Sequence, residues 1–242
     1  MNKLSDRNIV KQSHILNNAS YKFSALAIDI IMTMVTEIRM EDIDFNPSII
    51  AISSLEKKIN KRIDRRILSN LSLELMTPII KIELENGGFI RTAWFSSFEY
   101  KPNQGLIELS FDPKLKPYLL ELKENFVLGY LSEITPLKSQ YTKRIYMLLR
   151  QRSNIGKYSI AVYELQKVLN VPKTYLEYKV FKSRVLTPSI KAINKTSSMK
   201  ISLIEVKLSR KVQNLTFIIK TIKTNKVNNT GIKVLEDWYN NQ

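Results

Sequence analysis

The chain carries a sequence pattern that returns after 110 residues. In SSLEKKIN and in the later stretch VYELQKVLN, Leu55 corresponds to Leu165 and Asn60 corresponds to Asn170. The proline of a Thr-Pro pair stands 18 residues after each asparagine, in MTPIIK and in LTPSIK. A period this long indicates two duplicated domains rather than a solenoid of short repeats.

Both copies have the same predicted order of elements: an opening helix, a helix-turn-helix and a β-hairpin. Apolar residues at helical spacing predict the helices, and alternating runs around a turn predict the hairpins. Asp64 and Thr174 are predicted to be the N-caps of the two longer helices. The predicted helices are 23–38, 54–60 and 65–76, then 137–152, 161–169 and 177–194, and the predicted hairpins are IIKIEL with FIRTAWF and MKISLIEV with NLTFIIKTI.

This order is that of the winged helix. The sequence therefore predicts an α+β fold of two tandem winged-helix domains, each a helix-turn-helix plus a β-hairpin, related by internal duplication. We expect an N-terminal domain over 1–130, which contacts DNA or dimerises, and a C-terminal domain over 131–224, which binds DNA sequence-specifically. Residues 225–242 are expected to form a C-terminal tail.

The net charge of +16 arises from 38 Lys plus Arg against 22 Asp plus Glu, and such a field attracts nucleic acid or an anionic membrane surface. A membrane span is not expected, because FSALAIDIIMTMV is interrupted by Asp29 and is shorter than the about 20 apolar residues that a bilayer requires. The N-terminus lacks an apolar signal core, and the absence of cysteine fits a reducing compartment. We therefore expect a cytoplasmic protein that binds nucleic acid.

The excess cations cluster at the two predicted helix-turn-helix units. A DNA major groove about 12 Å wide admits one helix, whose N-terminal residues reach the base edges, while a flanking hairpin can contact phosphates. The alternative for any one of these residues is an ordinary solvated position. The predicted DNA-binding residues of the C-terminal domain are Lys173, Thr174, Tyr175, Lys179, Lys182, Ser183, Arg184, Lys207, Ser209, Arg210 and Lys211, and those of the N-terminal domain are Lys57, Lys58, Lys61, Arg62, Arg65 and Arg66.

The stretch YTKRIYMLLRQR forms the predicted opening helix of the second copy. Its apolar stripe, Ile145, Leu148 and Leu149, is expected to support the recognition helix from behind. Lys143 and Arg144 near its start are predicted to contact phosphate, whereas the two arginines near its end could complement the negative pole of the helix dipole. These two arginines are Arg150 and Arg152.

One feature of the second recognition helix conflicts with an ideal helical phase. With Phe181 and Val185 buried, Lys182 falls near the buried arc of the helix. Pro188 offers a reason, because an interior proline kinks or ends a helix.

Catalysis is not expected. The chain has one histidine, His14, placed in a loose N-terminal tail, so the imidazole and thiolate groups of zinc sites and nucleophilic triads are lacking. Neither a His-x-His pair nor a P-loop occurs. The acidic residues Glu41, Asp42 and Asp44 are interpreted as a solvated loop. No metal and no cofactor are predicted.

Residues 137–221 resemble the core signature of the plasmid replication initiator family, the iteron-binding Rep proteins of theta-replicating plasmids. A Gly-Arg-Lys-Val stretch of that family corresponds to Ser209–Val212, and Asn170 stands where glycine is common. The N-terminal part resembles the family in architecture and length. The matching residues are Ser139, Tyr141, Lys143, Arg144, Tyr146, Leu148, Leu149, Arg150, Gln151, Leu165, Leu169, Val171, Pro172, Tyr178, Phe181, Lys182, Arg184, Val185, Leu186, Pro188, Ile190, Ile193 and Asn194.

This resemblance implies a plasmid-associated bacterial initiator that binds direct repeats, the iterons, in an origin of double-stranded DNA. It further implies help in opening the origin, recruitment of the host initiator and replicative helicase, and repression of its own gene as a homodimer, in equilibrium with a monomer, on an operator inverted repeat. Two alternatives stay open: a winged-helix transcription repressor without initiator activity, and an RNA-binding or protein-bridging double winged helix.

Overall fold

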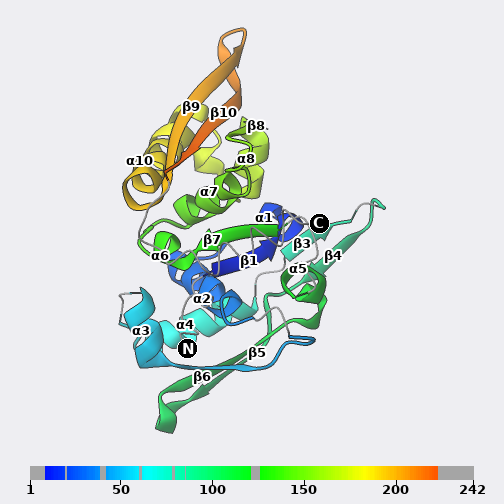
Figure 1. Cartoon of the computed structure of the whole chain (residues 1–242), viewed down its shortest axis with the longest axis vertical. Helices are drawn as coiled ribbons and strands as arrows, with labels where there is room; N and C mark the ends of the chain where they lie inside the picture. Colours follow the sequence, from blue (N-terminus) through cyan, green and yellow to red (C-terminus); the bar gives the residue numbers. More distant parts are fainter. Residues whose placement is uncertain are drawn as a thin grey trace.

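The computed structural model describes residues 9–19, 21–38, 42–59, 62–77, 80–84, 86–120 and 126–222. They form two modules, stacked along the long axis of the molecule in Figure 1. The buried apolar side chains of both modules form one continuous cluster. The predicted tail over 225–242 lies outside the described residues.

The second module is a winged helix. It contains α7 (Gln140–Arg150), β8 (Lys157–Ala161), α8 (Val162–Val168), a long helical segment over 178–196, and the hairpin of β9 (Met199–Leu208) and β10 (Lys211–Thr221). The strands form an antiparallel sheet in the order β8-β10-β9. The hairpin projects beyond the helices at the top of Figure 1.

The first module has the same topology. Its elements are α2 (Ala25–Val35), β2 (Ser48–Ala51), α3 (Ile52–Ile59), α4 (Arg65–Met76), β5 (Phe95–Lys101) and β6 (Leu106–Phe111). The sheet order β2-β6-β5 reproduces β8-β10-β9. Since α3 begins at residue 52 and α8 at residue 162, the 110-residue spacing of the sequence is the spacing of the two helix-turn-helix units. The predicted pair of winged helices is confirmed.

The hairpin predicted from IIKIEL and FIRTAWF is not the wing of the first module. It forms a separate two-stranded sheet of β3 (Ile80–Glu83) and β4 (Phe89–Thr92), while β5 and β6 take the place of the wing. The prediction was wrong because a short alternating run around Asn-Gly has the same local pattern in either role. Only the order of the strands in the sheets shows that β5 and β6, rather than β3 and β4, form the wing.

The second half of the repeat has different structures in the two modules. Thr77 is the C-cap of α4, whereas Thr187 and Pro188 lie inside the long helical segment. That segment runs through α9 (Tyr178–Phe181), a π-helical turn η5 (Lys182–Leu186) and α10 (Thr187–Thr196). A π turn carries one extra residue, so it shifts the helical phase and leaves Lys182 exposed between buried Phe181 and Val185.

The predicted N-caps have different outcomes. Asp64 caps α4, because its carboxylate accepts a hydrogen bond from the backbone N–H of Ile67 at 2.7 Å. Thr174 does not cap a recognition helix, since it lies in the 3-10 turn η4 (Lys173–Tyr175) and α9 starts four residues later. The cap of α9 is Glu177, without a side-chain hydrogen bond.

The Asp64 cap leads to a stability prediction. Asp64→Ala is expected to lower the free energy of unfolding by about 1 kcal/mol, because it removes the acceptor of an N–H at the start of α4. Asp64→Asn keeps an acceptor and is the matched control. Urea unfolding followed by circular dichroism measures both variants. An equal loss in the two would contradict the capping role.

Smaller elements join the modules. Among them, β1 pairs antiparallel with β7. The remaining segments are β1 (Ile9–Ser13), α1 (His14–Asn18), η2 (Pro102–Gln104), η3 (Pro113–Leu115), α5 (Lys116–Leu119), β7 (Phe126–Tyr130) and α6 (Leu131–Ile134). His14 therefore begins a helix and is partly buried, rather than standing in a loose tail.

The contact between the modules is polar as well as apolar. The Asn17 side chain donates to the Met147 carbonyl at 3.1 Å and to the Gln151 side chain at 2.8 Å. Lys143 on α7 bonds to Asp29 on α2 at 2.6 Å. Helix α7 thus packs against both modules, and the domain boundary placed between residues 130 and 131 stays a prediction.

Candidate nucleic-acid interface

The start of the second recognition helix is exposed and basic. Most of the predicted contact residues here have exposed side chains: Lys173, Thr174, Lys179, Lys182, Ser183 and Arg184. Tyr175 differs, because it is partly buried and its ring lies 6.4 Å from that of Tyr141. The 3-10 turn and the helix start therefore present cations and two hydroxyls to solvent, while Tyr175 packs against α7.

One of these cations is held by the wing. The Lys182 ammonium lies 2.5 Å from the carboxylate of Glu205 on β9. The Lys182 contact lowers the pKa of the Glu205 carboxyl, and burial raises the pKa of the nearby Tyr178 hydroxyl, with Glu205 adding to the rise. Sequence reasoning missed Glu205, because nothing in the sequence signals which strand residue faces the helix.

Hydrogen bonds also fix the recognition helix to the wing and to α7. The Asn194 amide donates to the carbonyl of Ile201 at 2.9 Å and accepts from the Ile201 N–H at 2.6 Å. The Thr142 and Ser189 hydroxyls lie 2.9 Å apart in the buried contact between α7 and α10. The recognition helix, its supporting helix and the wing therefore form one connected unit.

The tip of the second wing is a cluster of exposed cations. Lys207, Arg210 and Lys211 are exposed around the turn between β9 and β10. Ser209 in this turn has a φ of 56°, a left-handed conformation that glycine adopts without cost. Asn170 after α8 likewise has a φ of 47°. Both positions at which the resemblance led us to expect glycine therefore adopt a positive φ.

The first module presents fewer cations at its wing. Lys57, Arg62, Arg65 and Arg66 are exposed around α3 and α4, whereas Lys61 and the Lys58 side chain lie outside the described residues. The wing of this module ends in Pro102–Gln104 and Gly105. Near that tip, Lys101 bonds to Glu108 at 2.6 Å and lies 3.6 Å from Glu99. The basic surface of the first module is thus on its helices rather than on its wing.

The structure contradicts the prediction that Lys143 and Arg144 contact phosphate. Both residues are buried between the modules, at 1% and 4% exposure of the whole residue. Lys143 bonds to Asp29 and donates to the Ile134 carbonyl at 2.7 Å. Arg144 donates to the Ala19 carbonyl at 2.6 Å and lies 3.8 Å from the Tyr21 ring centroid. Both cations join the modules, because α2 and the residues before it pack over the face of α7 that carries Lys143 and Arg144.

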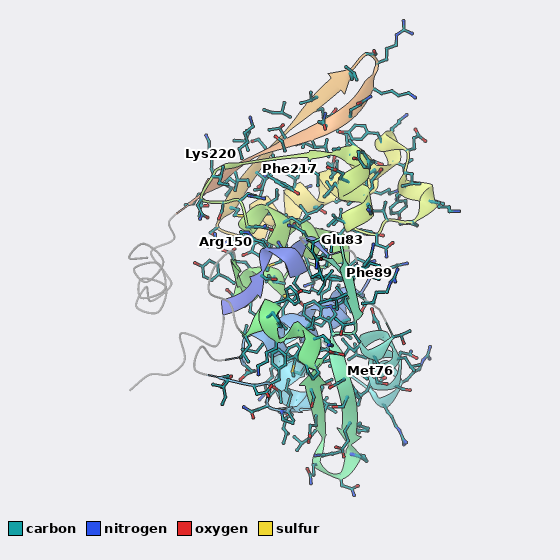
Figure 2. All side chains as sticks on the ribbon, turned by 90° about the vertical axis from the view of Figure 1, so that its right-hand side faces the viewer. Met76, Glu83, Phe89, Arg150, Phe217 and Lys220 are labelled. Carbon is teal, nitrogen blue, oxygen red and sulfur yellow. The ribbon has the colours of Figure 1, made fainter. Side chains whose placement is uncertain are left out.

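The two arginines at the end of α7 are held by aromatic rings. The guanidinium of Arg150 lies 4.8 Å from the Tyr130 ring centroid, and that of Arg152 lies 6.0 Å from the Tyr158 ring centroid. Figure 2 labels Arg150 at the level where the two modules meet. The apolar stripe of the helix is buried, as the sequence predicted.

Both modules match models of one protein family. The model described as "Initiator Replication protein, WH1" matches residues 9–150, and the model described as "Initiator Rep protein, WH2" matches residues 161–219. The chain belongs to the initiator replication protein family.

Relatives and solved structures of this initiator family agree with the assignment. The chain is 27% identical over 173 residues to the "Probable replication protein rep" of Bifidobacterium longum, covering 69% of this chain and 57% of the relative. It is 26% identical over 141 residues to a "Replication initiation protein" of Escherichia coli, covering 56% and 42%. The chain thus spans about half the length of these curated relatives.

A solved structure has the same fold as this initiator-family chain. It is the Pi initiator protein in complex with iteron DNA, with a TM-score of 0.70 and 18% identity, covering 90% of this chain and 99% of that one. At this identity the likeness establishes the fold. The two family models name the modules WH1 and WH2, and the WH1 match extends through α7.

Two further findings concern the parts of this initiator-family chain that the structure describes. No group of three or more His, Cys, Asp or Glu residues there is arranged to hold a metal ion. No helix there is both long enough and apolar enough to cross a bilayer.

Proposed function

We propose that this chain is a plasmid replication initiator that binds direct repeats in an origin. The observation that carries the proposal is the connected unit of recognition helix, supporting helix and basic wing in the second module. Such a unit can place the start of a helix in a major groove while the wing contacts phosphates. The complex of the similar Pi initiator with iteron DNA supports the same type of target.

The finer steps belong to the same proposal. The bound protein helps to open the origin and recruits the host initiator and the replicative helicase, and as a homodimer it represses its own gene on an inverted repeat. It acts without catalysis of its own, in the cytoplasm of the bacterium that carries the plasmid. The exposed residues of the second recognition helix and wing, with Lys57, Arg62, Arg65 and Arg66 of the first module, are the proposed DNA contacts.

Footprinting on the DNA that flanks the gene tests this proposal. We expect protection of direct repeats about two helical turns apart, and sedimentation of the complex should give one monomer per repeat. Protection of an inverted repeat alone, with two chains bound, would favour a transcription repressor. An unprotected flanking region would overturn the initiator proposal and favour an RNA-binding or protein-bridging function.

A further inference from the structure

The hairpin of β3 and β4 is additional to the two winged helices. It forms its own two-stranded sheet, whereas each module has a complete three-stranded sheet without it. Its inner face buries Ile80, Ile82 and Thr92, and its outer face is exposed. The role of that exposed face is not explained by the winged-helix fold.

The outer face carries a pair of like charges. Lys81 on β3 stands directly opposite Arg91 on β4 in the antiparallel register. Like charges opposite one another in a sheet are destabilising. Both cations lie against the ring of Phe89, with Lys81 Nζ 4.9 Å and the Arg91 guanidinium 4.5 Å from its centroid. The half-exposed ring therefore holds two cations together at the surface.

The acidic group on this face neutralises part of that charge. Glu83 lies 2.7 Å from Lys81. The pKa of the Glu83 carboxyl is lowered by its bond to Lys81, with weaker contributions from Lys167 and Arg91. Two cations and one carboxylate leave a net positive charge on this face, and that charge favours binding of an anion.

One residue of the second helix-turn-helix unit lies within electrostatic reach of the hairpin. Lys167, which acts electrostatically on Glu83, is an exposed residue of α8. Figure 2 shows Glu83 and Phe89 near one another, at the height where the modules meet. The first helix of a helix-turn-helix crosses the DNA backbone. The hairpin cations and Lys167 of α8 thus act on the same carboxylate, Glu83, which places the hairpin near the helix expected to cross the DNA backbone.

We propose that the Lys81–Phe89–Arg91 face of the β3–β4 hairpin binds the phosphate backbone of duplex DNA beside the segment bound by the second recognition helix. In this proposal Phe89 holds the two cations in place and makes no contact with the bases. A guanidinium can donate two hydrogen bonds to one phosphate, and the ammonium adds a second charge. This inference rests on the proposed function, and it assigns a DNA contact to a hairpin that is neither recognition helix nor wing.

The test compares two double variants of equal net charge. Lys81→Ala with Arg91→Ala removes the proposed contact, whereas Lys22→Ala with Lys114→Ala removes two exposed cations of other segments, before α2 and in η3. Binding to a duplex with one repeat and ample flanking DNA is measured at several salt concentrations. Each neutralised phosphate contributes about 0.9 to the log-log slope, so the hairpin variant should lose about 1.8. When salt rises from 50 to 200 mM, the affinities of both proteins fall. The factor by which the affinity of the hairpin variant falls should be about 12 times smaller than the factor for the native protein.

The same contact predicts how the effect depends on the DNA. The ratio of affinities for repeat and random duplex should stay unchanged, because phosphate contacts carry no sequence information. Phe89→Leu keeps both cations but removes the ring, so it should lower the slope by less. Thermal unfolding checks that each variant is folded. A slope change no larger than that of the Lys22 and Lys114 variant would overturn the proposal.

Failure of this inference is distinguishable from failure of the proposed function. If the native protein prefers repeats but the hairpin variant keeps the native slope, the hairpin inference alone is wrong. If the native protein binds random duplex equally well, the initiator proposal fails. The slope on random duplex then still decides whether the hairpin contacts phosphate.

Discussion

Lys143→Ala is expected to lower the free energy of unfolding by about 3–5 kcal/mol, because it leaves a buried carboxylate without this cation. The Lys143 side chain is 0% exposed and that of Asp29 is 9% exposed, with 2.6 Å between Nζ and Oδ1. The Ile134 carbonyl, which accepts from Lys143 at 2.7 Å, loses the same donor. Urea unfolding measures the loss, and Lys157→Ala, at an exposed position of β8, serves as the control.

The pair itself is expected to add little net stability. Burial lowers the pKa of the Lys143 ammonium and Lys138 adds to the fall, although Asp29 acts to raise it. Taking two charges out of water is costly, and their attraction offsets much of that cost. Lys143→Met combined with Asp29→Leu should therefore lose less stability than Lys143→Ala alone. A double variant at least as unstable as Lys143→Ala would contradict this interpretation. The pair would then stabilise the contact between modules beyond its desolvation cost.

Arg184→Ala and Lys211→Ala are expected to weaken DNA binding in two different ways. Arg184 is exposed near the start of the second recognition helix, so its loss should cost about 1–3 kcal/mol on the cognate repeat and relax preference at one base position. Lys211 is exposed at the wing tip, so its loss should weaken binding to all sequences and lower the salt slope by about 0.9.

Titrations on a repeat duplex and on a random duplex, each at several salt concentrations, separate these outcomes. Lys22→Ala is the control for a lost surface charge, because Lys22 is exposed and belongs to the segment before α2 rather than to the recognition helix or the wing. Equal losses for Arg184→Ala on the specific and the random duplex would contradict base readout by this arginine. An unchanged slope for Lys211→Ala would remove the wing tip from the phosphate contacts.

Local sequence patterns were sufficient to predict the helices and strands that form the site. Helical periodicity placed α3, α4, α7 and α8 within a few residues of their ends, and the Asp64 cap and the hairpin of β9 and β10 were also predicted. These features depend on contacts between near neighbours in the chain, such as i to i+4 bonds or a tight turn. The exposed cations of the second recognition helix follow from the same local information.

Features that depend on distant partners could not be predicted. Asp29 and Lys143 are 114 positions apart, and neither residue type indicates that the other is its partner. The phase of the recognition helix also changed, because a π turn precedes Pro188. The sequence pattern predicted that a cation lies on a helix, but it could not predict which residues pack over that cation.

The sequence by itself determined two winged-helix modules, their 110-residue spacing and the basic character of the second recognition helix and wing. Those properties arise from periodicity, turn residues and charge along short stretches. The tertiary structure alone decided which hairpin is the first wing, which cations are buried between the modules, and that Lys81 and Arg91 meet on one ring. Each of these depends on strand order or on the packing of residues distant in sequence, and a linear pattern carries no such information.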